Sequence, residues 1–266
     1  MPRPRIGIQL SCLRLPLKRA LFTARELGAT TVELDARSAD LRPLAESATA
    51  LRQLRKLLDD LELRVSAVSF RTRRGYDTLD DLEGRIEATR RAMRLAHAVG
   101  ARFVVNQVGH LPEPGVDETV AFQTLTGVLR ELGAFGHHTG AMLLAETGGE
   151  SAAAIRRLLD ALPPGTVGVD LNPGNLIING FRPLEIIEQL GTEILHVHAS
   201  DAVRDLARRR GLEVPLGRGV ADFPALLGAL EERDYRGDIT IQREQSEDPV
   251  FEIGQGVKYL RGMTNA

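Results

Sequence analysis

Four ionisable or amide side chains in the second half of the chain each follow a short apolar run. They are Glu146, Asp170, His198 and Gln242. Carboxylate oxygens, an imidazole nitrogen and an amide oxygen are ligands that divalent cations take in proteins. If these side chains converge from adjacent strands, they form a site for one divalent ion, for which we expect Mn²⁺, Mg²⁺, Co²⁺ or Zn²⁺. Glu146 is then the candidate general base beside the ion.

Two of these residues have a polar neighbour two positions away on the same expected strand. Side chains two apart on a strand share a face. His196 therefore points the same way as His198, and Glu244 the same way as Gln242 by the same rule. We expect His196, one layer deeper, to be a hydrogen-bonded core residue. Glu244 is a second candidate catalytic group, which either reaches the mouth and replaces Gln242 or pairs with an arginine.

The elements that would carry these residues alternate along the chain. Short runs rich in β-branched and apolar residues predict eight strands, at 5–11, 30–36, 65–72, 103–108, 141–147, 167–171, 194–199 and 238–244. Apolar residues spaced by three and four predict intervening helices with one buried face, in 15–27, 79–99, 118–139 and 152–162. An unbroken alternation favours a parallel sheet covered by helices, and eight units favour its closure.

We therefore predict the α/β class and a single (β/α)₈ TIM barrel that spans residues 1–266 as one domain. Active sites of this fold lie at the C-terminal ends of the strands, where the four polar residues are expected. The barrel places both termini on the N-terminal side. It also makes the long connection 201–223 the candidate for an active-site loop over the opposite mouth.

The composition limits the kinds of partner. The chain has 43% hydrophobic and 26% charged residues, and its net charge of −2 gives no reason to expect nucleic acid or an anionic membrane. No run approaches the ~18 apolar residues of a membrane span. The one cysteine, Cys12, excludes an intrachain disulfide and fits a reducing compartment. Without an apolar secretory stretch, we expect a cytoplasmic protein with a small-molecule partner, and a homo-oligomer stays open.

Three stretches around the polar residues are typical of one family. They are 169–175 (Val-Asp-Leu-Asn-Pro-Gly-Asn), 196–201 (His-Val-His-Ala-Ser-Asp) and 215–219 (Pro-Leu-Gly-Arg-Gly). In order and spacing, the chain resembles the xylose-isomerase-like sugar phosphate isomerase/epimerase family over essentially its whole length. The resemblance implies a TIM barrel with a metal held by Glu, Asp, His and Glu from strands five to eight. The first three match residues 146, 170 and 198, whereas Gln242 replaces the last.

The departure at Gln242 bears on the chemistry that the resemblance implies. In the family's epimerases the two glutamates also serve as acid/base partners on opposite faces of the sugar carbon. With one carboxylate replaced by a neutral amide, both metal affinity and two-base chemistry are in question. The family's sugar-contacting arginine, six residues after the metal histidine, is matched by Arg204. A histidine often found three residues after the metal aspartate is replaced by Pro173.

Polar residues near the ends of the other expected strands are candidate substrate contacts. Asn106, Gln107 and His110 lie near the end of strand four or just beyond it, and Gln242 is a further substrate-binding candidate. The first two strands add Gln9, Glu33 and Asp35. The arginine-rich run 71–74 could meet a phosphate or a sugar acid, but we favour a solvated loop for it.

The expected function is a metal-dependent isomerase or epimerase acting on a sugar, a sugar phosphate or a related polyhydroxy compound through an enediolate. Glu146 is the expected base, and Gln242 or Glu244 orients the substrate or completes the metal shell. A keto-sugar lyase on the same site is an alternative, because one-base chemistry suits the loss of the opposing carboxylate. A non-catalytic sugar-binding barrel is a third hypothesis. An abasic-site endonuclease is disfavoured, because it would need more histidines at strand ends and a basic face.

Overall fold

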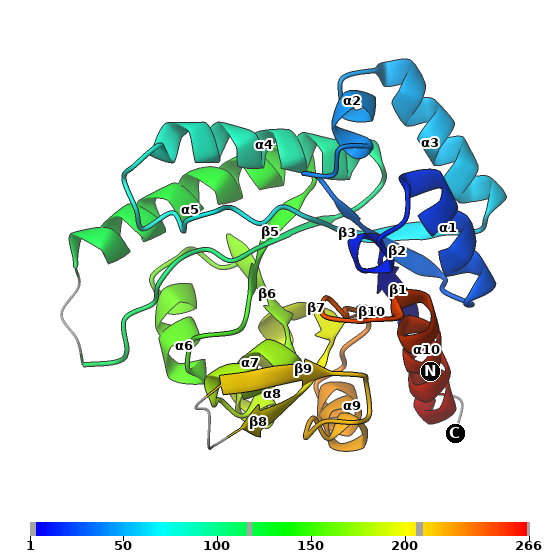
Figure 1. The fold of residues 1–266 in the computed structure, drawn as a ribbon. Helices are drawn as coiled ribbons and strands as arrows, with labels where there is room; N and C mark the ends of the chain where they lie inside the picture. Colours follow the sequence, from blue (N-terminus) through cyan, green and yellow to red (C-terminus); the bar gives the residue numbers. More distant parts are fainter. Residues whose placement is uncertain (1–3, 116–118, 206–209, 265–266) are drawn as a thin grey trace.

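Eight parallel strands close into a barrel, which confirms the predicted fold class (Figure 1). The computed structural model describes residues 4–115, 119–205 and 210–264. The strands follow one another in chain order around the barrel, and the last pairs with the first, with Ile241 beside Ile8. The barrel strands are β1 (Arg5–Gln9), β2 (Thr31–Asp35), β3 (Arg64–Ser69), β4 (Phe103–Asn106), β5 (Met142–Glu146), β6 (Val167–Leu171), β7 (Ile194–Ala199) and β10 (Asp238–Ile241).

The eight barrel strands lie where the sequence predicts them, but several end earlier. β10 ends at Ile241, so Gln242 and Glu244 lie on the loop that follows it. The predicted strand 238–244 therefore extends beyond the end of β10. The two side chains still lie next to each other, with Nε2 of Gln242 3.4 Å from Oε1 of Glu244. Gln242 is buried, whereas the side chain of Glu244 is 47% exposed.

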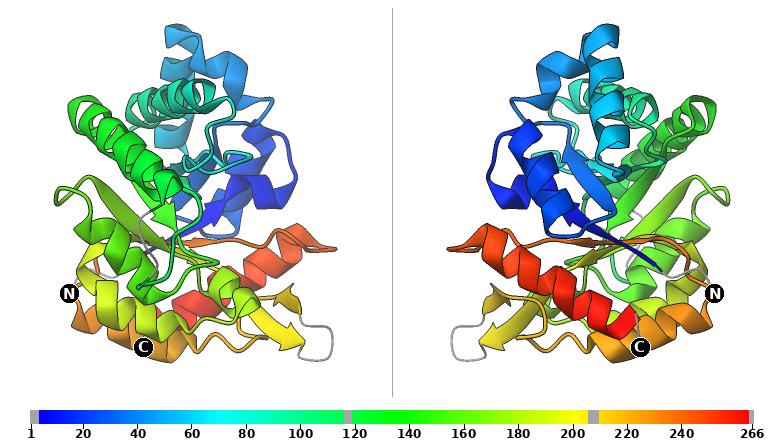
Figure 2. Two further views of the ribbon diagram at one scale, coloured as in Figure 1. Left: turned by 90° about the vertical axis from the view of Figure 1, so that its left-hand side faces the viewer. Right: turned by 90° about the vertical axis from the view of Figure 1, so that its right-hand side faces the viewer.

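Helices cover the outside of the barrel, and the longer ones bury an apolar stripe. In α5, for example, Leu125, Leu129 and Leu132 are buried at spacings of three and four. Figures 1 and 2 show α4 and α5 side by side. No helix in the described ranges is both long enough and apolar enough to cross a membrane. The helices are α1 (Leu17–Glu26), α2 (Leu41–Ala45), α3 (Ala48–Asp60), α4 (Leu82–Ala98), α5 (Val120–Thr139), α6 (Ala152–Asp160), α7 (Pro173–Asn179), α8 (Pro183–Leu190), α9 (Phe223–Glu232) and α10 (Pro249–Thr264), with 3₁₀ turns η1 (Leu10–Leu13) and η2 (Gly191–Glu193).

The described ends of the chain both lie at the N-terminal side of the barrel, as predicted. Arg5 at the start of β1 pairs with Asp238 at the start of β10, at 2.6 Å. Arg261, near the end of α10, donates a hydrogen bond to the carbonyl of Gly28, which precedes β2.

The long connection 201–223 contains an antiparallel hairpin that the sequence does not predict. The hairpin consists of β8 (Asp201–Asp205) and β9 (Arg210–Val214) and lies beside α7 (Figure 1). Glu213 of β9 accepts a hydrogen bond of 2.9 Å from Arg243, just after β10, so the connection lies at the C-terminal end of the barrel, as predicted. Its residues 206–209 lie outside the described part of the chain.

Gly211 lets β9 approach α7 closely. A Cβ atom at this position would lie 2.3 Å from Cα of Ile178 in α7, so only a residue without a side chain fits. Because α7 begins directly after β6, beside Asp170, this contact helps to fix the C-terminal mouth of the barrel.

Gly211→Ala should therefore lower the free energy of unfolding by about 1–3 kcal/mol, because the backbone of α7 has to move away. Gly228→Ala is the matched control. A Cβ there meets no described atom within 4 Å, and the residue is exposed in α9, where alanine is favoured over glycine by up to ~1 kcal/mol. Denaturant unfolding of both variants measures the difference. A Gly211→Ala variant as stable as wild type would contradict the close packing of β9 on α7.

Candidate metal centre and active site

Glu146, Asp170 and His198 come together at the C-terminal ends of β5, β6 and β7. Glu146 lies beside Asp170 in the register of β5 and β6. One ligand atom from each of the three residues lies within 4.8 Å of the other two. All three side chains are buried, so their charges are stabilised by one another and not by water. We call these three residues the Glu146 cluster.

The imidazole of His198 lies between two carboxylates. Its Nδ1 is 2.7 Å from Oδ2 of Asp170, and its Nε2 is 2.7 Å from Oε2 of Glu33 on β2. Burial disfavours the charged imidazole, but the two carboxylates outweigh burial and raise the pKa of His198 well above its ordinary value. Burial likewise raises the pKa of a carboxyl group, yet the charge of His198 brings the pKa of Glu33 and of Asp170 down to about 2.

One carboxylate oxygen of Glu146 has no hydrogen-bond partner among the described residues. Its Oε1 accepts hydrogen bonds from Asn172 at 2.8 Å and from Arg71 at 3.0 Å, and it lies 3.8 Å from Nδ1 of the histidine. Its Oε2 is buried and receives no hydrogen bond from any described residue. Burial raises the pKa of Glu146, although the nearby Arg71 and His198 oppose the rise. A buried carboxylate oxygen with no donor marks a place where an ion or a substrate proton belongs.

Asn172 joins Glu146 to Gln242. Its Nδ2 donates to Oε1 of Glu146 and to Oε1 of Gln242, both at 2.8 Å. Its Oδ1 accepts from Oγ of Ser200 at 2.5 Å and from the backbone N–H of Asn175 at 3.1 Å, the bond that caps α7. These four bonds fix the orientation of Asn172, and Asn172 in turn holds the amide oxygen of Gln242 on the side of Glu146.

Arg71, just after β3, links Glu146 to Glu244. One terminal nitrogen of its guanidinium lies 3.0 Å from Glu146, and the other pairs with Glu244. Burial lowers the pKa of Arg71, but the two carboxylates outweigh this effect and raise it. Nε2 of Gln242 lies 3.4 Å from Oε1 of Glu244. Of the two arrangements that the sequence leaves open for Glu244, the structure shows the pair with an arginine.

The Glu146 cluster fits a divalent cation, because it offers two carboxylates and an imidazole nitrogen at ligand spacing. A second group, formed by Glu33, His196 and His198, has similar spacing. Both oxygens of Glu33 already accept hydrogen bonds, however, whereas Oε2 of Glu146 is open. A carboxylate on the far nitrogen of a ligating histidine fixes its tautomer, so Glu33 would direct Nδ1 of His198 toward the ion.

Two further side chains hold the carboxylates in place. His196 is a hydrogen-bonded core histidine, as expected, with Nδ1 2.7 Å from Asp170 and Nε2 2.8 Å from Oγ1 of Thr240. Gln9 donates to Oε1 of Glu33 at 2.6 Å. The carboxylates of the site are thus oriented by side chains that lie deeper in the barrel or on adjacent strands.

Three predicted substrate contacts on β4 and its loop make no hydrogen bond to the Glu146 cluster in the described structure. Asn106 is buried and shapes the chain after β3. Its Oδ1 accepts from the backbone N–H of Thr72 at 3.0 Å, and its Nδ2 donates to the hydroxyl of Tyr76 at 2.8 Å. Gln107 and His110 are exposed on the loop after β4.

Arg204 is exposed on β8, and its guanidinium lies against Gly180 at the end of α7. A substrate role for this arginine therefore stays a prediction that rests on its spacing from His198.

The sequence understates the part played by three residues. Arg71, for which a solvated loop is favoured, reaches the Glu146 cluster. Glu33, expected as a substrate contact, instead holds His198. Asn172 caps a helix and also orients Gln242. Position near a strand end is the signal that all three share. It identifies residues near the mouth but not their partners, which come from other strands.

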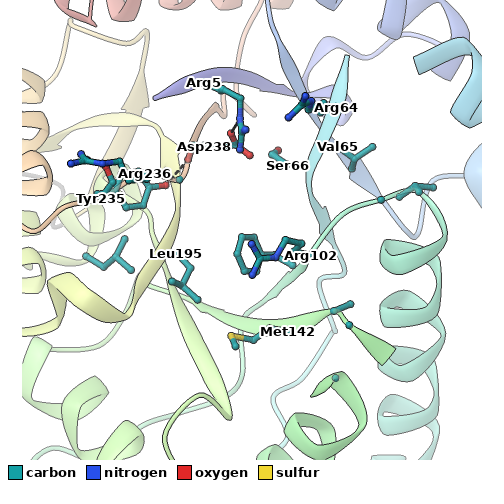
Figure 3. A pocket seen from close by; sticks show the side chains of 18 of the residues that line it. Arg5, Arg64, Val65, Ser66, Arg102, Met142, Leu195, Tyr235, Arg236 and Asp238 are labelled. Carbon is teal, nitrogen blue, oxygen red and sulfur yellow. Dashed lines mark hydrogen bonds and ion pairs between the residues drawn. The ribbon is translucent and has the colours of Figure 1, made fainter. Parts of the chain in front are cut away.

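A cavity of about 940 Å³ opens at the opposite end of the barrel (Figure 3). Arg5, Arg64 and Arg102, at the starts of strands, line it together with Met142 and Leu195. Of the described residues that border it, none is a candidate catalytic or metal-binding residue. Because chemistry in this fold takes place at the C-terminal ends of the strands, we place the site at the Glu146 cluster and not in this cavity.

A family model described as xylose isomerase-like TIM barrel matches residues 21–263. The chain belongs to this family. This xylose isomerase-like barrel is similar to a protein of Lacticaseibacillus casei named inosose dehydratase, with 27% identity over 208 residues, which cover 64% of this chain and 67% of that protein.

Solved structures resemble this xylose isomerase-like barrel over nearly its whole length. A xylose isomerase domain protein from Planctomyces limnophilus has a TM-score of 0.85 at 23% identity, and 98% of each chain is covered. A D-tagatose 3-epimerase-like protein has a TM-score of 0.78 at 19% identity, again with 98% of each chain covered. At these identities the likeness shows the fold.

Binding of a divalent ion should strengthen as the pH rises. Nδ1 of His198 carries a proton in the metal-free protein, because the pKa of this histidine is raised, and an ion at Nδ1 must displace that proton. The apparent affinity for Mn²⁺ should rise by up to about tenfold per pH unit below that pKa, with about one proton released per ion. Calorimetry in buffers of different ionisation enthalpy measures both quantities. Ion binding without proton release would show that His198 is not a ligand.

Proposed function

We propose that this protein is a metal-dependent dehydratase that removes water from a polyhydroxy ketone. The observation that carries the proposal is the amide of Gln242, which Asn172 holds beside Glu146 where the family's second carboxylate is expected. The names of the similar proteins, inosose dehydratase and D-tagatose 3-epimerase-like protein, support an enzyme that acts on sugars or related compounds. Inosose, a keto-inositol, is itself a polyhydroxy ketone.

Elimination of water from a β-hydroxy ketone needs only one carboxylate. Oε2 of Glu146 accepts the proton from the carbon beside the carbonyl, and a C=C bond forms as the C–O bond at the next carbon breaks. The proton then passes from Glu146 to the departing hydroxide, which leaves as water, so no oxidant or reductant is needed. Epimerisation differs, because a proton must leave from one face and return on the other, which calls for two groups.

The surroundings of Glu146 suit this role. Burial raises its pKa toward the range in which a carboxylate both accepts and returns a proton. Oε1 accepts from Asn172 and Arg71 and lies 3.8 Å from Nδ1 of His198, so it is the oxygen that would face an ion, which leaves Oε2 for the proton. Asp170 and His198 would hold a divalent ion with Glu146. When bound, such an ion would polarise the carbonyl and hydroxyl oxygens of the substrate and make the neighbouring C–H more acidic.

Purified protein with Mn²⁺ or Mg²⁺ should convert a polyhydroxy ketone, with inosose as the first choice, into a product that has lost one water. Mass spectrometry and the ultraviolet absorption of the conjugated product measure this conversion. Glu146→Gln should lower kcat by about 10²–10⁴-fold. Glu83→Gln removes the same charge at an exposed position of α4 and should leave kcat unchanged. Turnover that Glu146→Gln leaves intact would contradict the assignment.

An isomerase or epimerase is the second candidate, and Glu244 is the observation that favours it. Its carboxylate shares Arg71 with Glu146, so a second acidic group is present at the mouth. Turnover in deuterated water separates the two candidates. An epimer or isomer that carries deuterium and keeps its water, in amounts that fall in Glu244→Gln, would replace the dehydratase proposal with this one.

A further inference from the structure

A small cavity opens at the mouth of the barrel, on the side of β1, β2 and β3. Its volume of about 290 Å³ is near the lower end of the ~300–1,000 Å³ that small-molecule sites occupy. Among the described residues that line it, Arg14, Arg37 and Arg71 supply three positive charges, and Asp35 and Glu244 supply two negative ones. The wall of this cavity therefore carries an excess of positive charge, and one of its arginines, Arg71, also contacts Glu146.

Two of the arginines donate hydrogen bonds to backbone carbonyls, which are neutral acceptors. Arg14 donates to the carbonyl oxygens of Glu244 at 2.6 Å and Ser246 at 2.8 Å. Arg37 donates to the carbonyl oxygen of Arg71 at 2.6 Å. These bonds fix the backbone on both sides of the Arg71–Glu244 pair, so the two side chains of that pair face each other from rigid supports.

The two carboxylates on Arg71 differ in how easily they can be replaced. The side chain of Glu146 is 0% exposed and has no water to move into, whereas that of Glu244 is 47% exposed. An exposed ion pair contributes little to stability, so Glu244 can turn into solvent at small cost. Another anion can then take its place on Arg71, which remains attached to Glu146 through its other terminal nitrogen.

We propose that the substrate carries an anionic group, a carboxylate or a phosphate, that replaces Glu244 on Arg71. The guanidinium of Arg71 offers the planar donor fork that both groups accept. This inference rests on the proposed function and narrows its substrate to an anionic polyhydroxy ketone, whose carbonyl end reaches Oε2 of Glu146. The neutral amide at Gln242 agrees with it, because a carboxylate there would repel such a substrate.

Calorimetry with three sugars that share a carbon skeleton tests the proposal: D-fructose, D-fructuronate and D-fructose 6-phosphate. One of the anions should bind at least about tenfold more tightly than D-fructose, in keeping with hydrogen bonds to charged groups. Arg71→Met should abolish this preference. Glu244→Gln should tighten binding of the anion by about two- to fivefold, because the competing carboxylate is gone. Glu247→Gln removes the same charge from an exposed position of the same loop and should change nothing.

Each outcome bears on the proposal. Tighter binding of D-fructuronate assigns the subsite to a carboxylate, and tighter binding of D-fructose 6-phosphate assigns it to a phosphate. Equal affinity for charged and neutral sugars, no binding of either anion, or a preference that survives Arg71→Met would overturn it. The Glu244→Gln comparison does not depend on whether Arg71→Met folds. Dehydration of neutral ketones as fast as anionic ones would overturn this inference alone. Arg71-dependent anion binding without loss of water from any ketone would instead overturn the dehydratase.

Discussion

The imidazole of His198, held between the carboxylates of Asp170 and Glu33, is the interaction on which the rest of the site depends. Two carboxylates buried in the barrel cannot both stay ionised unless positive charge lies between them. In the metal-free protein the proton on His198 supplies that charge. An ion at the Glu146 cluster would take over this role on the side of Nδ1, while Glu33 keeps hold of Nε2. The carboxylates of Asp170 and Glu33 would thus stay ionised in both the metal-free and the ion-bound protein, and the ion would replace the proton on Nδ1 of His198.

Next to this network, the residue at position 242 changes the net charge of the site, whereas its effect on the geometry of the site is small. Asn172 can only donate through Nδ2, so whatever stands at position 242 must present an acceptor. A carboxylate oxygen would accept the same bond as the amide oxygen of Gln242. The amide therefore removes one negative charge while the bond from Asn172 is kept. This one change is consistent with a weaker hold on a cation, with one-base chemistry at Glu146 and with room for an anionic substrate near Arg71.

The barrel and the positions of Glu146, Asp170 and His198 could be predicted, because each strand is a short apolar run that ends in a polar residue. The partners of these residues could not be predicted. Glu33 meets His198 across 165 residues of sequence, and a local pattern carries no information about which strands close the barrel. The end of β10 at Ile241 could not be predicted either, and Glu244 lies on the loop beyond it, where it pairs with Arg71. The β8–β9 hairpin gave no signal either, since it packs on a helix rather than in the barrel.

We infer that Gln242 faces the ion site as a neutral substitute for a carboxylate. Titration of Mn²⁺ into wild type and Gln242→Glu by calorimetry tests it most directly. Gln245→Glu, which adds the same charge at an exposed position of the same loop, is the control. Gln242→Glu should bind Mn²⁺ at least about tenfold more tightly than wild type, in keeping with ~1.5–3 kcal/mol for interactions with charged groups, and the control should bind as wild type does. Equal affinity in wild type and Gln242→Glu would show that this side chain does not face the ion, and would contradict the account.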